Sequence, residues 1–207
     1  LSGTMNGCIP VDKDGNALHA NIIHSDTRTE KQVEVISHVI SPGNFYQLTG
    51  NRLDPHYTLP KILWIKEHLP NVYQATRFWL NTKDYVYGKL TGRFGYTDYS
   101  DASLTTALDI RGRAWASELL KSLDIDENTM PRIVPGHDVR GRITRDVYRQ
   151  TGLITGTPVA IGGGDGACTA RGAGVSEPGS GYTYIGSTAW VSQIMRAPLF
   201  DEQERIF

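Results

Sequence analysis

The sequence predicts an α/β protein, on three observations. Apolar residues recur at helical spacing in four stretches between residues 29 and 123. After residue 131, short apolar runs typical of strands alternate with short helical stretches. Glycine accounts for 22 of the 207 residues, and it is concentrated between residues 162 and 186. Since glycine permits backbone conformations closed to other residues, this segment is expected to turn sharply or to lie against another group.

The first predicted element is a β-hairpin over residues 7–23. Two apolar stretches, residues 7–11 and 17–23, flank the sequence Asp-Lys-Asp-Gly-Asn, which is typical of a turn. Because proline has no backbone N–H to donate, Pro10 restricts the first strand to the edge of a sheet or to a strand end.

Four helices are predicted next. The first is expected to stop at residues 41–43, Ser-Pro-Gly, and the second at Pro70. Thr82 is expected to cap the third helix and Gly92 to end it. The predicted ranges, with the residues expected to face inward, are 29–40 (Val33, Ile36, Val39, Ile40), 58–69 (Ile62, Leu63, Ile65, Leu69), 82–91 (Tyr85, Val86, Leu90) and 115–123 (Trp115, Leu119, Leu120, Leu123).

Strands and short helices alternate in the remainder of the chain. Strands are predicted at residues 139–143 and 157–161, and helices at residues 145–151 and 167–174. Two further strands are predicted within residues 181–194, around a Gly-Ser-Thr turn. The strand at residues 157–161 is apolar and ends at a run of glycines, so it is expected to be buried inside a mixed sheet.

Composition excludes several classes of function. Lysine and arginine total 21 against 22 acidic residues, a net charge of −1, so no long-range field attracts nucleic acid or an anionic membrane. Cys8 and Cys168 are far apart and form no CxxC pair, which argues against a disulfide framework or a zinc site. No apolar run approaches the roughly 20 residues that cross a bilayer. We therefore expect a cytoplasmic protein with no metal site formed by these residues.

The best candidate site is the turn Gly162-Gly163-Gly164-Asp165-Gly166. An acid at the carboxyl end of a strand in an α/β sheet faces the crevice where ligands bind, and glycines let a ligand approach the backbone. Asp165 is therefore a candidate general base that accepts a proton from a substrate hydroxyl. The alternative is that Asp165 caps the following helix and that the glycines only form the turn.

Three other segments admit both a functional and a structural interpretation. The turn at residues 186–188 offers amides and hydroxyls to phosphate oxygens, or is a plain hairpin turn. Residues 24–28, His-Ser-Asp-Thr-Arg, offer hydrogen bonds to a polyol, or form a cap and an ion pair. Residues 97–103 supply several hydroxyls and carboxylates before another helix, and helix capping explains most of them. The P-loop, zincin and α/β-hydrolase motifs are absent, and the dinucleotide fingerprint occurs only in its alanine-ended form at residues 162–167, without an acid to hold a ribose.

A series of short segments follows the order and spacing of one known family. The segments are residues 2–7 with the turn at 12–15, 24–28, 80–92, 97–103, 152–159, 162–165 and 184–188. Together they resemble the FGGY family of carbohydrate kinases, and its pentulose kinases (xylulokinase-like members) most closely. The resemblance implies a ribonuclease H-like, actin-like ATPase domain with helices on both faces of a mixed sheet. It also implies that ATP and a sugar meet in a cleft between two such domains.

The resemblance assigns roles to individual residues. Asp165 matches the catalytic aspartate that deprotonates the sugar hydroxyl attacking the γ-phosphate of ATP. Met5 and Asn6 match a substrate-contacting pair, but xylulokinases usually carry Met-His there, so the identity of the sugar stays open. His56 matches a position that lines the polyol site of the related glycerol kinases. The turn that contacts the ATP phosphates corresponds to Gly186, Ser187 and Thr188.

The resemblance also divides the chain and predicts a reaction. Residues 1–174 correspond to most of an N-terminal domain without its first phosphate-binding hairpin, and residues 175–207 to the opening strands of a C-terminal domain, so a truncation at both ends is expected. The expected reaction transfers the γ-phosphate of ATP, as its Mg²⁺ complex, to a hydroxyl of a pentulose such as xylulose, or of a related ketose or polyol. The isolated chain is expected to be inactive and able to form a homodimer. A non-catalytic sugar-binding or regulatory domain is the alternative.

Overall fold

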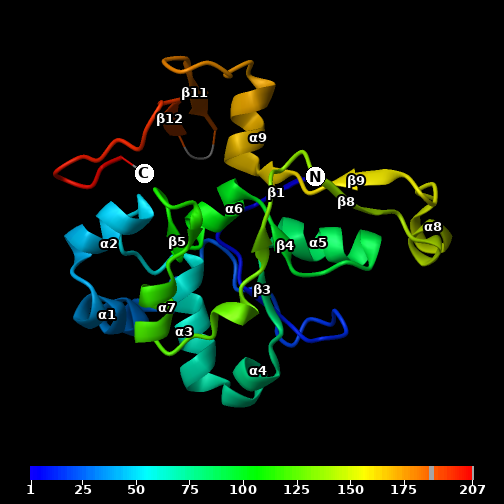
Figure 1. Ribbon diagram of the computed structural model, residues 1–207, viewed down its shortest axis with the longest axis horizontal. Helices are drawn as coiled ribbons and strands as arrows, with labels where there is room; N and C mark the ends of the chain where they lie inside the picture. Colours follow the sequence, from blue (N-terminus) through cyan, green and yellow to red (C-terminus); the bar gives the residue numbers. More distant parts are fainter. Residues whose placement is uncertain (187–188, 207) are drawn as a thin grey trace.

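The protein is described by a computed structural model that covers residues 1–186 and 189–206. Helices and short strands alternate along these residues (Figure 1), so the predicted α/β class is confirmed. No helix in these ranges is long and apolar enough to span a membrane. The helices are α1 (Glu30–Val39), α2 (Pro42–Thr49), α3 (Thr58–His68), α4 (Pro70–Ala75), α5 (Thr82–Thr91), α6 (Tyr99–Leu104), α7 (Ser117–Ser122), α8 (Arg145–Thr151) and α9 (Asp165–Gly172), with a 3-10 turn at Glu127–Thr129.

The strands are short and pair in twos across the described part of the chain. Parallel pairs join segments that are far apart in the sequence, whereas the last antiparallel pair is a hairpin. The parallel pairs are β1 (Ser2–Gly3) with β10 (Gly163–Gly164), and β4 (Tyr96–Thr97) with β7 (Arg132–Ile133). The antiparallel pairs are β2 (Ile9–Val11) with β3 (Phe78–Leu80), β5 (Leu108–Asp109) with β6 (Ala114–Trp115), β8 (Val139–Arg142) with β9 (Pro158–Ala160), and β11 (Gly181–Ile185) with β12 (Ala189–Gln193).

A glycine turn explains why β9 does not continue into a larger sheet. The strand predicted over residues 157–161 ends at Ala160, and the next residue, Ile161, is buried. Gly162 then adopts a left-handed φ of +85°, and β10 begins directly after it. Because this turn redirects the chain, β9 pairs with β8 while β10 pairs with β1, in place of the one mixed sheet predicted.

The apolar core has three parts. The largest lies among α1, α2, α3 and α7, and two smaller ones lie beneath α5 and beside β2. The central residues of the largest part are Ile36, Phe45, Leu59, Ile62, Ile65 and Leu120. Those of the part beneath α5 are Tyr87, Val134, Ile143, Val159 and Ile161, and those of the part beside β2 are Ile9, Val11 and Leu80. The first part anchors α3, which carries a lysine that contacts the candidate site.

Helices α2 and α4 were not predicted from the sequence. Ser41 is the N-cap of α2, where its hydroxyl accepts a hydrogen bond from the Asn44 amide at 3.3 Å, and Pro42 is the first residue of the helix. Pro70 likewise begins α4. Proline at the first position of a helix costs nothing, because the N–H that it lacks has no partner there. Residues 41–43 and Pro70, which were interpreted as helix ends, therefore also begin the next helices, α2 and α4.

The hairpin predicted over residues 7–23 is only partly formed. Isolated antiparallel bridges join Cys8 to Ile22 and Val11 to Ala17. The regular partner of β2 is instead β3, which lies far along the chain and was not predicted. Two of the three residues of β3 are buried, so pairing with β3 covers apolar surface, whereas residues 17–23 form only the two isolated bridges.

Helix α5 begins and ends as predicted, with Gly92 as a left-handed C-cap, but it buries a different face. Val86, which was expected to face inward, is 42% exposed, and Tyr85 and Leu90 are half-buried. Thr82 is the first helical residue, and its neighbour Asn81 is the N-cap. The face that is buried carries Lys83, Asp84, Tyr87, Gly88 and Thr91.

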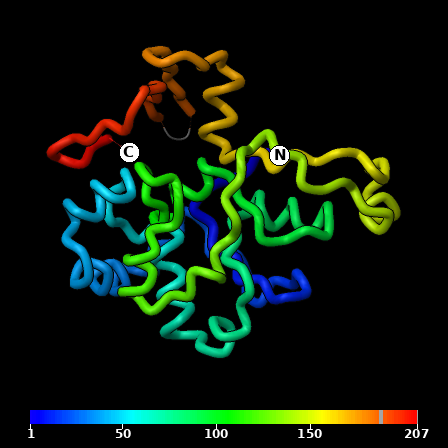
Figure 2. Tube along the Cα trace, in the orientation of Figure 1, coloured from blue at the N-terminus to red at the C-terminus, as the bar shows by residue number. Residues whose placement is uncertain are grey.

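The C-terminal segment returns to α2. The Tyr46 hydroxyl donates a hydrogen bond to the Ile206 carbonyl at 2.6 Å and accepts one from the Asp201 amide at 3.1 Å. The Tyr46 ring also meets the Phe200 ring edge-on. Figure 2 shows this course, with the β11–β12 hairpin beside α9 at one end and the trace then running back toward α2. The last part of the chain is thereby joined to the helical part.

The turn at Gly162 generates the first prediction. A Cβ at this position would lie 1.9 Å from the Leu1 carbonyl oxygen, whereas a Cβ at Gly152, which has a similar φ of +80°, would meet nothing within 4 Å. Gly152→Ala should therefore lower the free energy of unfolding by roughly 1 kcal/mol, the cost of the left-handed backbone. Gly162→Ala should cost at least about 2 kcal/mol more. Urea unfolding of both variants checks this, and equal losses would contradict it.

Candidate functional site

Asp165 is the first residue of α9, and its side chain is exposed. Its Oδ1 accepts a hydrogen bond from the Gly166 amide at 2.9 Å. The N-cap position is occupied by Gly164, and no side chain caps this end of the helix. Asp165 is therefore not the helix cap that the structural alternative required. Its carboxylate lies at the positive end of the helix dipole and is open to a ligand.

Met5 lies against the turn that carries Asp165. A Cβ added to Gly164 would be 2.3 Å from the Met5 sulfur, so the methionine side chain packs directly on the glycine backbone. The Gly164 amide donates a hydrogen bond to Ser100 Oγ at 2.9 Å. Two residues matched to the site by sequence, Met5 and Asp165, are thus brought together around one glycine.

The loops that carry Asn6 and His56 meet at a buried lysine. Lys61, in α3, is fully buried, and its side-chain nitrogen donates hydrogen bonds to three backbone carbonyls. The acceptors are the carbonyls of Asn6 at 2.7 Å, Ile23 at 2.9 Å and His56 at 2.6 Å. Burial lowers the pKa of Lys61 to about 8. The three segments are therefore tied to one point.

Asn6 has two unusual features. Its φ is +60°, in the left-handed region that asparagine tolerates better than most residues. Its side-chain oxygen Oδ1 is buried and has no hydrogen-bond partner among the described residues. A buried acceptor without a donor costs about 1–3 kcal/mol. His56 differs, because its ring is about half exposed and pairs with the Asp54 carboxylate.

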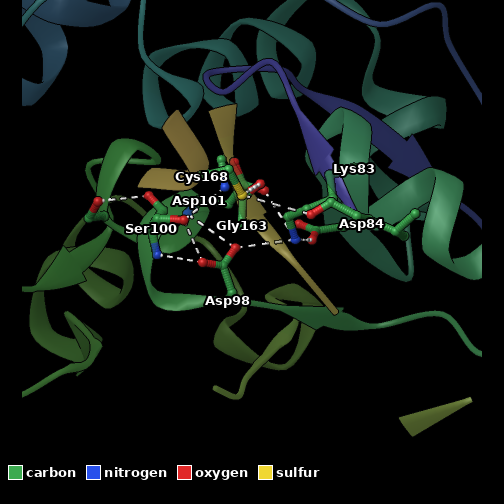
Figure 3. Close-up of polar contacts among 10 residues, drawn as sticks. Lys83, Asp84, Asp98, Ser100, Asp101, Gly163 and Cys168 are labelled. Atoms are coloured by element: carbon green, nitrogen blue, oxygen red, sulfur yellow. Dashed lines mark hydrogen bonds and ion pairs between the residues drawn. The ribbon is translucent and has the colours of Figure 1, made fainter. Parts of the chain in front are cut away.

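A buried cluster of charges lies beside the Gly163 strand (Figure 3). The Lys83 side-chain nitrogen lies 2.6 Å from Asp84 Oδ1, 3.2 Å from Asp98 Oδ1 and 3.2 Å from Asp101 Oδ2. Burial acting alone would lower the pKa of Lys83, but the three carboxylates outweigh it and raise that pKa. Burial raises the pKa of Asp84, and burial together with the Asp84 charge raises the pKa of Asp101 to about 8.

This cluster connects to the candidate base through Ser100. Asp98 is the N-cap of α6, and its Oδ2 accepts hydrogen bonds from the Ser100 amide, at 2.9 Å, and from the Ser100 hydroxyl. The same hydroxyl accepts the hydrogen bond from the Gly164 amide. Because Gly164 immediately precedes Asp165, the cluster fixes the backbone from which the candidate base projects. Figure 3 shows Ser100 between Asp98 and the Gly163 strand.

The C-terminal hairpin lies against the start of α9. The Tyr182 hydroxyl donates a hydrogen bond to the Gly166 carbonyl at 3.3 Å and accepts one from Trp190 Nε1 at 2.9 Å. Tyr184 and Trp190 stack with ring centroids 4.0 Å apart. Gly186 follows β11 directly, so the predicted phosphate-binding turn is carried by a hairpin that contacts the residue next to Asp165. Ser187 and Thr188 lie outside the described residues.

A comparison with family models decides the family. The model for the FGGY family of carbohydrate kinases, N-terminal domain, matches residues 1–172. The chain belongs to the FGGY family.

Relatives of this FGGY chain are longer kinases. Xylulose kinase of Bacillus subtilis (strain 168) is 36% identical over 90% of this chain and 37% of its own length, and xylulose kinase of Staphylococcus xylosus is 34% identical over 91% and 39%. The crystal structure of xylulose kinase from Rhodospirillum rubrum superposes with a TM-score of 0.85 at 27% identity, over 92% of this chain and 39% of that one. The FGGY chain thus has the actin-like ATPase fold expected, and it spans about two fifths of the length of the relatives it matches.

The remaining candidate segments of the FGGY chain favour their structural interpretations. Arg28 forms an ion pair with Asp26 at 2.6 Å, and its guanidinium lies over the Trp64 ring. Residues 97–103 contain the Asp98 cap of α6. A cavity of about 420 Å³ beside α1 and α3 contains none of the residues matched to the sugar or to ATP; it is lined by Thr27, Arg28, Glu30, Lys31, Gln32, Trp64 and His68.

Sequence reasoning missed the residues that support the site. Lys61, Lys83, Asp84 and Asp101 lie in stretches that were assigned to apolar helix faces or to caps. One signal was available for Lys83 and Asp84. They are adjacent residues of opposite charge, and in a helix they lie on a different face from Val86. Buried charges are rare, and neither residue was predicted to be buried.

The raised pKa of Asp101 generates the second prediction. Its pKa is about 8 in the folded chain and about 4 in an unfolded one, so between these values the folded state binds more protons. The free energy of unfolding should therefore fall as pH rises from 4 to 8, by up to about 1.4 kcal/mol per pH unit from this group. Asp101→Asn should remove this part of the slope. Urea unfolding at pH 5, 6, 7 and 8 measures it.

The control for this experiment is Asp146→Asn, because the Asp146 side chain is 78% exposed. Its stability should follow that of the unmodified chain across the pH series. Parallel curves for Asp101→Asn and the unmodified chain would contradict the prediction.

Proposed function

We propose that the protein containing this chain transfers the γ-phosphate of ATP to a hydroxyl of a ketose, with a pentulose such as xylulose as the first candidate. The observation that carries the proposal is the position of Asp165, exposed at the start of α9 between Met5 and the hairpin that bears Gly186. The candidate base thus follows a glycine that Met5 packs against, and it precedes a glycine that the hairpin of the candidate phosphate turn contacts, which supports the proposal. Two relatives that are 34% and 36% identical are xylulose kinases, which supports the substrate class.

Asp165 acts as the general base in this proposal. Its carboxylate accepts the proton of the sugar hydroxyl, whose oxygen attacks the γ-phosphorus as the bond from that phosphorus to the bridging oxygen of ADP breaks. Such a transfer needs alignment and neutralisation of charge more than covalent help from the protein. The hydrogen bonds from Asp98 through Ser100 to Gly164 hold the backbone that sets this alignment.

Met5, Asn6 and His56 form the sugar side of the proposed site. Asn6 belongs to the pair matched to the substrate, and its side-chain amide can donate a hydrogen bond to a sugar hydroxyl or accept one from it. Met5 offers an apolar surface to the carbon face of the sugar and lies against the turn of the candidate base. His56 lies on the loop that Lys61 ties to Asn6, which supports its assignment to the rim of the site.

The nucleotide is assigned to Gly186 and to the two residues after it, Ser187 and Thr188, on sequence grounds. The described residues contain no group of three or more His, Cys, Asp or Glu side chains that could hold a metal ion. In this proposal Mg²⁺ arrives bound to the nucleotide phosphates, where it neutralises their charge. We assign residues 1–174 to one wall of the cleft and residues 175–207 to the start of the other. We place the reaction in the cytoplasm.

Replacing the candidate base tests the proposal directly. In the full-length protein, Asp165→Asn should lower kcat by about 10² to 10⁴, because a positioned general base contributes that much, and should leave the sugar KM within a few-fold. The release of ADP measures the phosphorylation of xylulose. Asp146→Asn, on the exposed face of α8, is the matched control and should be unchanged. An Asp165→Asn variant that keeps most of its turnover would show that Asp165 is not the base.

Asn6 gives a test of the sugar contact. Asn6→Gly removes the side chain and still permits the φ of +60°. The KM for the sugar should rise about tenfold through the lost hydrogen bond, while the KM for ATP stays within about twofold. Kinetics with a panel of pentuloses, hexuloses and polyols measure this and identify the preferred sugar. Asn16→Gly, in the exposed turn at residues 12–16, is the control. Equal changes in both KM values would contradict the assignment of Asn6.

A further inference from the structure

We propose that Lys61 is a positioning residue, whose buried side-chain nitrogen holds the three loops that form the sugar side of the site and thereby sets the affinity for the sugar. The inference deepens the proposed function and rests on it. Lys61 does not touch the sugar in this scheme. It acts through the backbone of Asn6 and His56, which do.

The geometry favours a holding role over a packing role. A lysine ammonium has three N–H donors, and Lys61 meets three carbonyl acceptors at 2.6–2.9 Å. No carboxylate among the described residues lies within ion-pair distance of its nitrogen. A buried cation without a counter-ion is costly, and a methionine of similar length would fill the same space without that cost. The hydrogen bonds to the three carbonyls are therefore what a lysine provides here and a methionine would not.

The three carbonyls come from segments that have no regular secondary structure. Asn6 follows β1 in a left-handed turn, Ile23 precedes the segment at residues 24–28, and His56 precedes α3. The isolated bridge between Cys8 and Ile22 and a 3.0 Å hydrogen bond from the Thr58 hydroxyl to the Gly7 carbonyl also join these segments in pairs, whereas Lys61 contacts all three at once. Without Lys61 the three buried carbonyls would lose a charged donor, and such loops relax toward water when their buried polar groups lose a partner. The left-handed turn at Asn6 is the most sensitive to this loss, because its backbone is strained.

The number of hydrogen bonds that Lys61 can donate depends on whether its side-chain nitrogen is protonated. The titratable groups that influence its nitrogen are Asp26, Arg28 and the Cys8 thiol, which stays neutral because burial raises its pKa to about 12. His56 and its partner Asp54 lie on the loop that supplies one acceptor. With the pKa of Lys61 lowered to about 8, the side chain has three donors below that pH and two above it. One carbonyl is therefore released as the pH rises through 8.

The experiment compares Lys61→Met with Lys66→Met in the full-length protein. Lys66 is on the same helix and also donates to backbone carbonyls, but those belong to Leu123 and Asp124, away from the site. Hydrogen–deuterium exchange is measured without ligand. Lys61→Met should speed exchange in residues 4–7, 22–25 and 55–58 together, and Lys66→Met should not.

The second part of the experiment measures the KM for the sugar and the KM for ATP. In Lys61→Met the KM for the sugar should rise at least about tenfold while the KM for ATP stays within about twofold, since only the sugar loops lose their anchor. In the unmodified protein the sugar KM should rise between about pH 7.5 and 9. The exchange of residues 4–7, relative to the intrinsic amide exchange rate at each pH, should become faster over the same range. This pH series needs no variant, so it remains decisive if Lys61→Met does not fold.

The outcomes separate the two proposals. Unchanged exchange in the three loops of a folded Lys61→Met variant, or a flat pH series with the fold intact, overturns the role of Lys61. Fast exchange in the three loops with an unchanged sugar KM also overturns it, because the loops would then not set affinity. If the full-length protein phosphorylates no sugar, the proposed function fails, and the exchange arm still decides whether Lys61 holds the loops.

Discussion

The buried ammonium of Lys83 is the constraint on which the centre of this molecule depends. It lies within 3.2 Å of carboxylates from α5 and from both the cap and the first turn of α6, so it joins the start of α5 to the start of α6. Removing one partner of a buried ion pair costs about 3–5 kcal/mol, because the other charge is left without compensation. Through Ser100 the same arrangement reaches the backbone before Asp165. A charge that stabilises the packing of two helices thus also orients a turn.

Lys61 and Lys83 show how opposite surroundings give buried lysines opposite properties. Carboxylates surround Lys83, and their charges outweigh burial, so its pKa is raised. Carbonyl dipoles surround Lys61, and they compensate less, so burial lowers its pKa to about 8. One lysine is therefore locked in its charged form at physiological pH, whereas the other can change its charge near the upper end of that range. Only the second is suited to report on pH.

The sequence predicted what depends on local pattern. The α/β class, the ranges of α1, α3, α5, α7 and α8, and the hairpin around residue 186 follow from periodicity and turn residues, and collinear motifs identified the family. What failed depends on tertiary contacts. The pairing of β2 with β3, the break at Gly162 and the buried face of α5 are each decided by a distant partner. Of the candidate site, the resemblance assigned both Met5 and Asp165 to the substrate, and the structure adds the packing of Met5 on Gly164, whereas Lys61 had no signal in the local sequence.

The packing of Met5 on Gly164 has a consequence for how this protein can change over time. The methionine sulfur occupies the space that any side chain at residue 164 would need, so each of the two positions limits which residues the other accepts. If Met5 contacts the sugar as proposed, a smaller residue at position 5 would open room for a bulkier sugar and would also leave the backbone before Asp165 without its support. A new sugar preference acquired through residue 5 would then require compensating changes around the glycine turn, so a single substitution at either position could reach only some of the possible specificities.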